Sequence, residues 1–288
     1  MIVDCHTHVG LAGRHVGGAI HEDLMRTWGR PLWHVPLEEH WAAMRAVDRA
    51  IVLAFDAPRI GVVVPNEYVA EYVSQHPEKL IGFASVDPHR DRAPALLEDA
   101  IRHLGLRGLK IAPIYQHFDP WSVEAYALYE AADALRIPVL WHQGTTFVRD
   151  APLIHARPVL LDEIARRFPN LTMWIAHLGH PWCDELIAVI RKHPNLYADM
   201  SALTPRPLQF YFAMASAVEY GVAHKIFFGT DYPFTTVESS LNGLRGVNQV
   251  AEGTGFPRIP EEVIEGIIQR NTLELLGITQ DIPGGRQQ

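Results

Sequence analysis

The chain has 288 residues and a formal net charge of −8 at pH 7, with 48% hydrophobic and 20% charged residues. This composition is ordinary for a globular protein, and an acidic chain without a basic run argues against a nucleic-acid partner. Two cysteines are too few for a disulfide framework, no apolar run is long enough to cross a membrane, and no signal peptide opens the chain. We therefore expect a cytoplasmic protein.

Short apolar runs recur along the chain, and they have the residue types expected of parallel strands that are buried on both faces. In chain order, the predicted strands are Ile2–His8, Arg49–Phe55, Leu80–Val86, Gly108–Ala112, Pro138–His142, Leu171–His177, Leu196–Ser201 and Lys225–Asp231. Helical spacing of apolar residues follows in the intervening segments. The predicted helices are Asn66–His76, Ala93–Leu104, Val123–Leu135, Val159–Phe168, Glu185–His193, Pro207–Tyr220, Ser239–Val250 and Glu261–Leu276.

The alternation of strands and helices predicts a parallel sheet, and eight such units in one chain favour an α/β fold, a closed (β/α)8 TIM barrel. An open doubly wound sheet is the alternative, but the chain contains neither a G-x-G-x-x-G turn nor a Walker loop. We expect a single domain over residues 1–279, in which residues 9–40 form an irregular inserted loop region at the catalytic mouth. Residues 280–288 are expected to form a disordered tail.

A His-x-His pair ends the first predicted strand. Residues two apart on a strand point the same way, so His6 and His8 can both face the barrel lumen. Neutral imidazole is a good ligand for divalent transition metals. Asp4 lies two residues earlier, and we expect it on the same face as a support for these ligands. A chance pair is the alternative, because the chain has 16 histidines.

Three other predicted strands also end in side chains that can bind a metal or transfer a proton. His142 ends the fifth strand, His177 the sixth and Asp231 the eighth. Barrel enzymes place their catalytic groups at the carboxyl ends of the strands. For Asp231 the alternative is a helix N-cap, but its position favours a metal ligand or a base.

Taken together, these motifs resemble the amidohydrolase superfamily over nearly the whole chain. The motifs are Asp4-Cys-His-Thr-His8, Gly108-Leu-Lys110, Trp141-His142, Ile175-Ala-His177-Leu-Gly-His180-Pro181 and Phe228-Gly-Thr-Asp231-Tyr-Pro233. They are most similar to the amidohydrolase-related branch that includes aminocarboxymuconate-semialdehyde decarboxylase. The resemblance implies that the metal ligands are His6, His8, His142 and Asp231. It also implies that His177 acts in proton transfer or polarisation, and that Asp231 also serves as the base.

The cofactor implied by this ligand set is one divalent metal ion, with zinc as the first expectation and manganese as the second. Lys110, at the end of the fourth strand, leaves two readings open. Some members of the superfamily carry a carboxylated lysine there that bridges two metals, whereas the related branch has one metal and an unmodified lysine. We favour a single metal, with Lys110 facing the substrate or serving the structure.

The resemblance leaves several functions open. The first expectation is a metal-dependent hydrolase that attacks a small-molecule amide, ester or lactone with an activated water. The alternative is a metal-dependent, non-oxidative decarboxylase of an aromatic or unsaturated carboxylate, because members of the superfamily do both. A metal-binding barrel without catalysis is the second alternative.

The expected partner is a small-molecule substrate, with no nucleic acid and no membrane, and a homo-oligomer is left open. Arginines in the loops after strands can grip a carboxylate with two hydrogen bonds. Each of them, taken alone, can equally be a surface charge. The candidate substrate contacts are Lys110, His180, Arg14, Arg59, Arg149 and Arg206.

Overall fold

A computed structural model describes residues 1–29 and 33–278 of the chain. The tail predicted over residues 280–288 lies outside this part. Within it, one parallel sheet contains eight strands, which match the eight predicted runs with shorter ends. The strands are β1 Val3–His8, β2 Arg49–Leu53, β5 Leu80–Ser85, β6 Leu109–Ile111, β7 Val139–Trp141, β8 Met173–Ile175, β9 Leu196–Asp199 and β10 Ile226–Phe227.

The sheet closes into a barrel. Its strands pair in parallel in the order β1-β2-β5-β6-β7-β8-β9-β10. The two outer strands then meet, because the amide of Cys5 donates to the carbonyl of Phe228 (3.1 Å) and the amide of Asp231 donates to the carbonyl of His6 (2.8 Å). The predicted (β/α)8 TIM barrel is therefore confirmed, and all strand carboxyl ends lie at one mouth.

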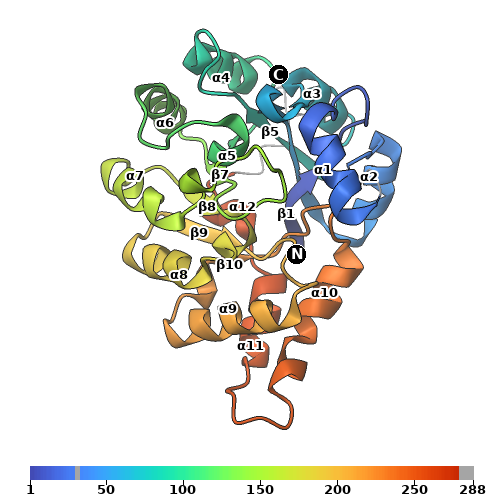
Figure 1. Cartoon of the computed structure of the whole chain (residues 1–288), viewed down its shortest axis with the longest axis vertical. Coiled ribbons are helices and arrows are strands. Elements are labelled where there is room, and N and C mark those ends of the chain that lie inside the picture. Colours follow the sequence, from blue (N-terminus) through green and yellow to red (C-terminus); the bar gives the residue numbers. More distant parts are fainter. Residues whose placement is uncertain (30–32, 279–288) are drawn as a thin grey trace, which may run out of the picture.

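Helices surround the barrel (Figure 1). They are α1 Gly18–Trp28, α2 Leu37–Ala43, α3 Asn66–Ser74, α4 Ala93–Arg102, α5 Pro113–Gln116, α6 Val123–Leu135, α7 Leu161–Arg167, α8 Cys183–Lys192, α9 Pro207–Glu219, α10 Val237–Arg245, α11 Glu261–Ile268 and α12 Thr272–Leu275. The bounds of α6 agree with the prediction, because the side chain of Ser122 caps its first turn. The helix predicted over 261–276 is divided into α11 and α12. Among the described residues, no helix is long and apolar enough to cross a membrane.

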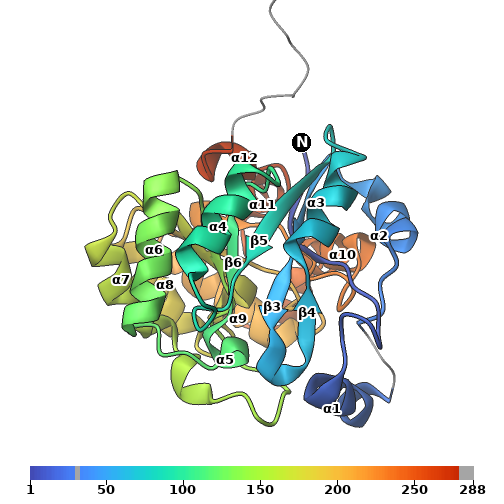
Figure 2. The ribbon, with the colours of Figure 1, turned by 90° about the horizontal axis from the view of Figure 1, so that it is seen from above.

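The segment 9–40 is less irregular than expected, because it contains α1 and the start of α2. A short antiparallel ribbon, β3 Phe55–Ala57 and β4 Val62–Val64, was not predicted, since three residues are too few to show alternation. Gly61 joins this ribbon to the first loop. Its φ is +82°, and a Cβ there would lie 2.3 Å from the carbonyl oxygen of Gly17. Figure 2 shows α1, β3 and β4 on the side of the barrel opposite α12.

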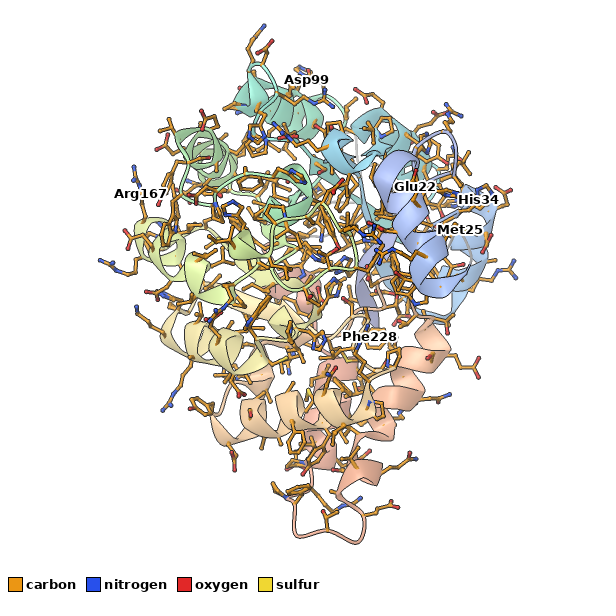
Figure 3. The ribbon with its side chains drawn as sticks, viewed as in Figure 1. Glu22, Met25, His34, Asp99, Arg167 and Phe228 are labelled. Atoms are coloured by element: carbon orange, nitrogen blue, oxygen red, sulfur yellow. The ribbon has the colours of Figure 1, made fainter. Side chains whose placement is uncertain are left out.

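The interior of the barrel is filled with apolar side chains at the end away from the mouth. A cluster of buried residues draws members from six of the eight strands and from α12, among them Cys5, Phe83, Trp174 and Leu273. A larger cluster, which includes Phe228, packs between the strands and the surrounding helices. Phe228 is buried and is labelled toward the middle of the view in Figure 3, whereas Asp99 and Arg167 lie at its edge. Because this end of the barrel is packed, the space inside the barrel that the described residues leave for a site lies at the mouth.

Candidate active site

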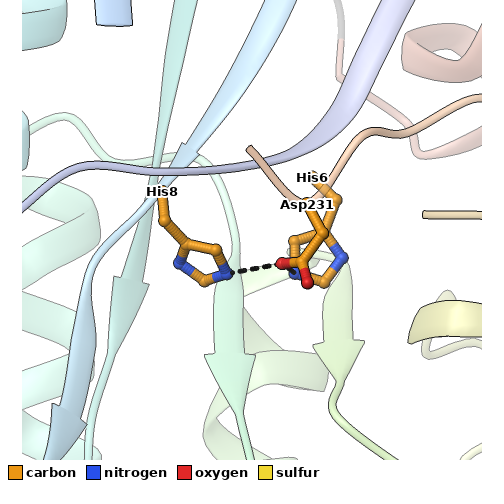
Figure 4. A group of neighbouring side chains, drawn as sticks. All are labelled: His6, His8 and Asp231. Carbon is orange, nitrogen blue, oxygen red and sulfur yellow. Dashed lines mark ion pairs between the residues drawn. The ribbon is translucent and has the colours of Figure 1, made fainter. Parts of the chain in front are cut away.

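Three of the predicted ligands meet at the mouth of the barrel. Oδ1 of Asp231 lies 3.3 Å from Nε2 of His6 and 3.1 Å from Nε2 of His8 (Figure 4). One donor atom from each of these residues lies within 4.8 Å of the other two, and all three residues are buried. The structure therefore brings together side chains from the first and the last strand of the barrel.

An irregularity in β1 aims both histidines at this point. Asp4 pairs with Ala50 of β2, but Thr7 pairs with Val52, so β1 has one extra residue between the two pairs. The extra residue changes which side chains point inward. Cys5 can therefore pack in the inner apolar cluster while His6, next in sequence, faces the site.

Asp4 does not support the histidine side chains as expected. Its carboxylate accepts hydrogen bonds from the amide (2.9 Å) and the hydroxyl (2.7 Å) of Thr230 and from the amide of His6 (3.2 Å). Burial raises the pKa of Asp4 to about 7, although these hydrogen bonds favour the charged form. Asp4 therefore holds the first strand against the segment that follows the last strand, next to the site.

His177 lies beside the three ligand candidates. It follows β8 in a left-handed turn (φ +57°), and its ring stacks on that of His6 with 5.0 Å between centroids. Its Nε2 lies 3.9 Å from Oδ2 of Asp231. Burial lowers the pKa of His177 to about 4, so the ring is neutral near pH 7. A neutral ring at this place can accept a proton.

His142, the fourth predicted ligand, lines the same site from the end of β7. Its ring centroid lies 5.1 Å from that of His177, and its Nε2 lies 3.2 Å from the carbonyl oxygen of Thr145. The close donor group among the described residues contains His6, His8 and Asp231 but not His142. Its role as a ligand stays a prediction.

Lys110 points into the site from the middle of β6. Its Nζ lies 3.5 Å from Nε2 of His6, and the residue is buried. Burial lowers the pKa of Lys110 to about 8, although Asp231 and Asp199 favour its charged form. Burial also lowers the pKa of His6, and the charge of Lys110 adds to this effect. The lysine therefore helps to keep His6 and His8 neutral.

Asp199 and Ser201, at and just after the end of β9, are site residues that the sequence reasoning missed. Oδ2 of Asp199 lies 3.1 Å from Nδ1 of His6, and Oγ of Ser201 lies 2.8 Å from Nδ1 of His177. The same signal that identified His142, a polar residue ending an apolar strand, was present here. The apolar run 196–201 ends in Ser201 and contains Asp199, so this signal marks both residues.

A cavity of about 520 Å³ opens above these residues. Its walls combine the site residues with aromatic side chains from α1 and several loops. The lining comprises His8, Ile20, Thr27, Trp28, Trp33, Phe55, Ile60, Lys110, Tyr115, His142, Thr145, Thr146, Phe147, His177, His180, Ala202, Leu203, Pro205, Arg206, Asp231, Phe234 and Thr235. The volume is within the range of small-molecule sites.

The cavity separates the candidate substrate contacts into two groups. His180 and Arg206 line it together with Lys110. Arg14, Arg59 and Arg149 are exposed and lie outside its lining. Arg14 lines a smaller surface pocket, Arg59 lies in a short turn between β3 and β4, and the amide of Arg149 donates to Asp23 (2.7 Å).

The donor set fits a divalent ion. Nδ1 of His6 faces the carboxylate of Asp199, and when the ring proton lies on Nδ1 the lone pair of Nε2 is directed at Oδ1 of Asp231. Two lone pairs facing each other at 3.3 Å repel unless a cation lies between or beside them. Nitrogen and carboxylate donors of this kind suit zinc and manganese.

Comparisons with known proteins agree with this architecture. An amidohydrolase family model matches residues 3–278. A search of curated proteins finds no match. Among solved structures, an uncharacterised TIM-barrel protein from Bordetella bronchiseptica is 21% identical, with a TM-score of 0.73 and coverage of 96% of this chain and 98% of that chain.

Two further solved structures carry names of enzymes. A probable 2-pyrone-4,6-dicarboxylic acid hydrolase from Acinetobacter baumannii, with citric acid bound, is 15% identical (TM-score 0.66, coverage 96% and 99%). A dihydroxybenzoic acid decarboxylase from a Polaromonas species, with bound manganese and the inhibitor 2-nitroresorcinol, is 17% identical (TM-score 0.63, coverage 96% and 97%). At these identities the likeness concerns the fold. Because the family model spans nearly all of the chain, this protein belongs to the amidohydrolase family.

Proposed function

We propose that this protein is a metal-dependent hydrolase of a small-molecule amide, ester or lactone. The observation that carries the proposal is the placement of Asp231. Its Oδ1 faces Nε2 of both His6 and His8, whereas its Oδ2 faces Nε2 of His177. One carboxylate therefore connects the candidate metal ligands with the candidate proton-transfer residue.

A divalent ion held by His6, His8 and Asp231, with His142 beside them, supplies Lewis acidity that polarises a carbonyl and acidifies water. Asp231 is suited to take up a proton from a water in the cavity. Burial raises the pKa of Asp231 above its ordinary value, although His177 and His6 work in the opposite direction. A carboxylate with a raised pKa is a stronger base near neutral pH.

The cavity also limits the substrate. Its aromatic walls, which include Trp28, Phe147 and Phe234, suit a flat and partly apolar molecule. Its cationic lining residues are the buried Lys110 and the exposed Arg206. Asp231 is the only carboxylate in that lining, so the field in the cavity favours a substrate with an anionic group.

Zinc is our first proposal for the ion and manganese the second. Imidazole and carboxylate donors support both metals. The manganese bound to the Polaromonas decarboxylase supports the second for a barrel of this architecture.

Non-oxidative decarboxylation is the second candidate, and the same cations favour it. An aromatic carboxylate would be held near Lys110 while its bond to the ring breaks and carbon dioxide leaves. The ring carbon would then receive a proton, and Asp231 with its raised pKa could supply it. The fold alone does not choose between the two reactions.

A substrate panel tests the proposal. Protein loaded with zinc or manganese is offered lactones, esters, amides and aromatic carboxylates, with acid release and carbon dioxide release followed in parallel. We expect hydrolysis, with ¹⁸O from labelled water in the product, and its loss in Asp231→Asn. Carbon dioxide release without ¹⁸O uptake would establish the decarboxylase instead. No turnover of any class would favour a metal-binding barrel without catalysis.

A further inference from the structure

We propose that Asp199 is a positioning residue that fixes the ring protons of His6 and His177 on Nδ1, so that both rings present an unprotonated Nε2 to the carboxylate of Asp231. This inference rests on the proposed function only for the roles of the two Nε2 atoms, which are cation binding for His6 and proton uptake for His177. The hydrogen bonds around the end of β9 connect Asp199 with both rings.

The contact with His6 is direct. Asp199 is fully buried, and its Oδ2 lies 3.1 Å from Nδ1 of His6. Its other oxygen, Oδ1, accepts from the amides of His177 and Ser201 and from the hydroxyl of Ser201, so the carboxylate is surrounded by donors. A carboxylate oxygen placed in this way accepts a hydrogen bond, so Nδ1 of His6 carries the proton.

The contact with His177 runs through Ser201. Nδ1 of His177 lies 3.1 Å from the carbonyl oxygen of Ser201, and a carbonyl can only accept. The hydroxyl of Ser201 donates to Oδ1 of Asp199, which leaves Oγ as a second acceptor for Nδ1 of His177 at 2.8 Å. Asp199 also accepts from the amides of His177 (3.1 Å) and Ser201 (3.0 Å).

The rings of His6 and His177 have different roles. Nε2 of His6 faces Asp231 and Lys110, where a lone pair can bind a cation. Nε2 of His177 faces the other oxygen of Asp231, where a lone pair can take up a proton. His8 is different, because its buried Nδ1 has no hydrogen-bond partner among the described residues. The ring of His8 is therefore not hydrogen-bonded to Asp199, and His8 can serve as an internal control when Asp199 is replaced.

A second cation site is the competing explanation for the same atoms. Donor atoms of His6, His177 and Asp199 lie within 4.8 Å of one another. Asp199, however, already accepts from three hydrogen donors, two amides and a hydroxyl, on Oδ1. Nδ1 of His177 faces two oxygen acceptors of Ser201, so it is a donor and has no lone pair for a metal.

The test reads the ring protons directly. Metal-stripped, full-length protein with ¹⁵N-labelled histidine is studied by two-bond ¹H–¹⁵N correlation, and signals are assigned by their absence from His6→Gln and His177→Gln. We expect Nδ1–H on both rings in the wild type. In Asp199→Asn the amide group can donate to Nδ1 of His6, so the proton of that ring should move to Nε2, with the His8 signals unchanged.

Metal affinity gives the second readout. Titration of zinc against a competing chelator should show affinity lower by about 10- to 100-fold in Asp199→Asn, as is typical when the partner of a ligating histidine is lost. Asp87→Asn is the matched control, because Asp87 is also buried but its carboxylate bonds with the amide and the ring of His89. Neither readout requires turnover, so failure of the hydrolase proposal would leave the result standing.

Several results would overturn the proposal. One is a proton on Nε2 of His6 or His177 in the wild type, which is decisive even if Asp199→Asn does not fold. Another is an Asp199→Asn protein that keeps both the wild-type ring protons and the wild-type affinity. A third is binding of two ions per chain with one lost in Asp199→Asn, which would make Asp199 a ligand.

Discussion

Oδ1 of Asp231 lies 3.1 Å from Nε2 of His8, and this contact joins the last strand of the barrel to the first. The amide of Asp231 reinforces the same junction by donating to the carbonyl of His6 at 2.8 Å. The site therefore exists only when the barrel is closed. Binding of an ion by these residues should in turn stabilise the closed barrel.

The first prediction concerns metal content. The purified protein should carry about one divalent ion per chain, because the donors of His6, His8 and Asp231 converge at the mouth and the second donor group shares His6 with them. Elemental analysis would measure it, and the melting temperature should fall on chelation. Replacement of His8 by Asn should lower the metal content, whereas replacement of the exposed His34 by Asn should not. A chain without stoichiometric metal, and without any gain in melting temperature on adding metals, would contradict the assignment.

The second prediction separates proton transfer from metal binding. Replacement of His177 by Asn should lower turnover by about 100-fold or more, the usual effect of losing a proton-transfer group. Metal content should stay the same, because Nε2 of His177 lies 3.9 Å from Asp231 and outside the close donor group of His6, His8 and Asp231. Steady-state kinetics and elemental analysis of the same sample check both statements. Loss of the metal in this variant would make His177 a ligand.

The third prediction concerns the anionic group of the substrate. Arg206→Met should weaken the binding of benzoate by about tenfold, since a hydrogen bond to a charged group is lost. Arg149→Met removes the same charge from a position outside the cavity lining and should have little effect. Quenching of the fluorescence of Trp28 and Trp33, which line the cavity, would report binding. Equal benzoate affinity in both variants would remove Arg206 from the substrate contacts, and benzamide serves as the uncharged control.

The fourth prediction concerns stability at a distance from the site. The ammonium group of Lys225 donates to the carbonyl oxygens of Ile190 (2.8 Å), His193 (2.5 Å) and Leu196 (3.2 Å) around the end of α8. Lys225→Met would leave these acceptors unpaired and should lower the free energy of unfolding by about 1–3 kcal/mol. Lys192→Met, which removes an exposed ion pair nearby, should cost less than about 1 kcal/mol. Urea unfolding would compare them, and equal losses would argue against the role of Lys225.

The fifth prediction is a pH dependence at the cavity rim. The amide of Arg149 donates to Asp23 and, with Arg26, lowers the pKa of that carboxyl below its ordinary value of 3.8. A carboxyl whose folded pKa is depressed stabilises the protein above its ordinary pKa and loses that effect as the pH falls through the folded value. Asp23→Asn should therefore be less stable than the wild type at pH 7, by about 1 kcal/mol or less because Arg26 is half exposed.

Urea unfolding of the wild type and Asp23→Asn across pH 7 to pH 3 would measure this difference. It should be largest near neutrality and shrink at acid pH. A difference that grows as the pH falls would show that the charge of Asp23 is not what joins α1 to the loop at Arg149.

Much of this protein could be predicted from the sequence because its signals are local. A buried parallel strand needs a continuous apolar run, so all eight strands of the barrel could be recognised. The polar residues that end such runs, including His6, His8 and Asp231, must lie at one mouth once the barrel is recognised. Their close approach follows from the fold class and needs no knowledge of individual side-chain contacts.

The tertiary structure alone decided how these residues are held and what surrounds them. The partner of a histidine across the barrel depends on an extra residue in β1 and on the stagger of β9, so the contact of Asp199 with His6 could not be derived from spacing. Arg206 lines the cavity and Arg149 does not, because the loops that carry them run in different directions. A loop has no periodic sequence pattern from which its direction could be predicted. The ends of the strands supply the side chains of the site, and a local sequence pattern reveals them. The loops determine the shape of the cavity, and hydrogen bonds across the barrel determine which ring nitrogens are protonated.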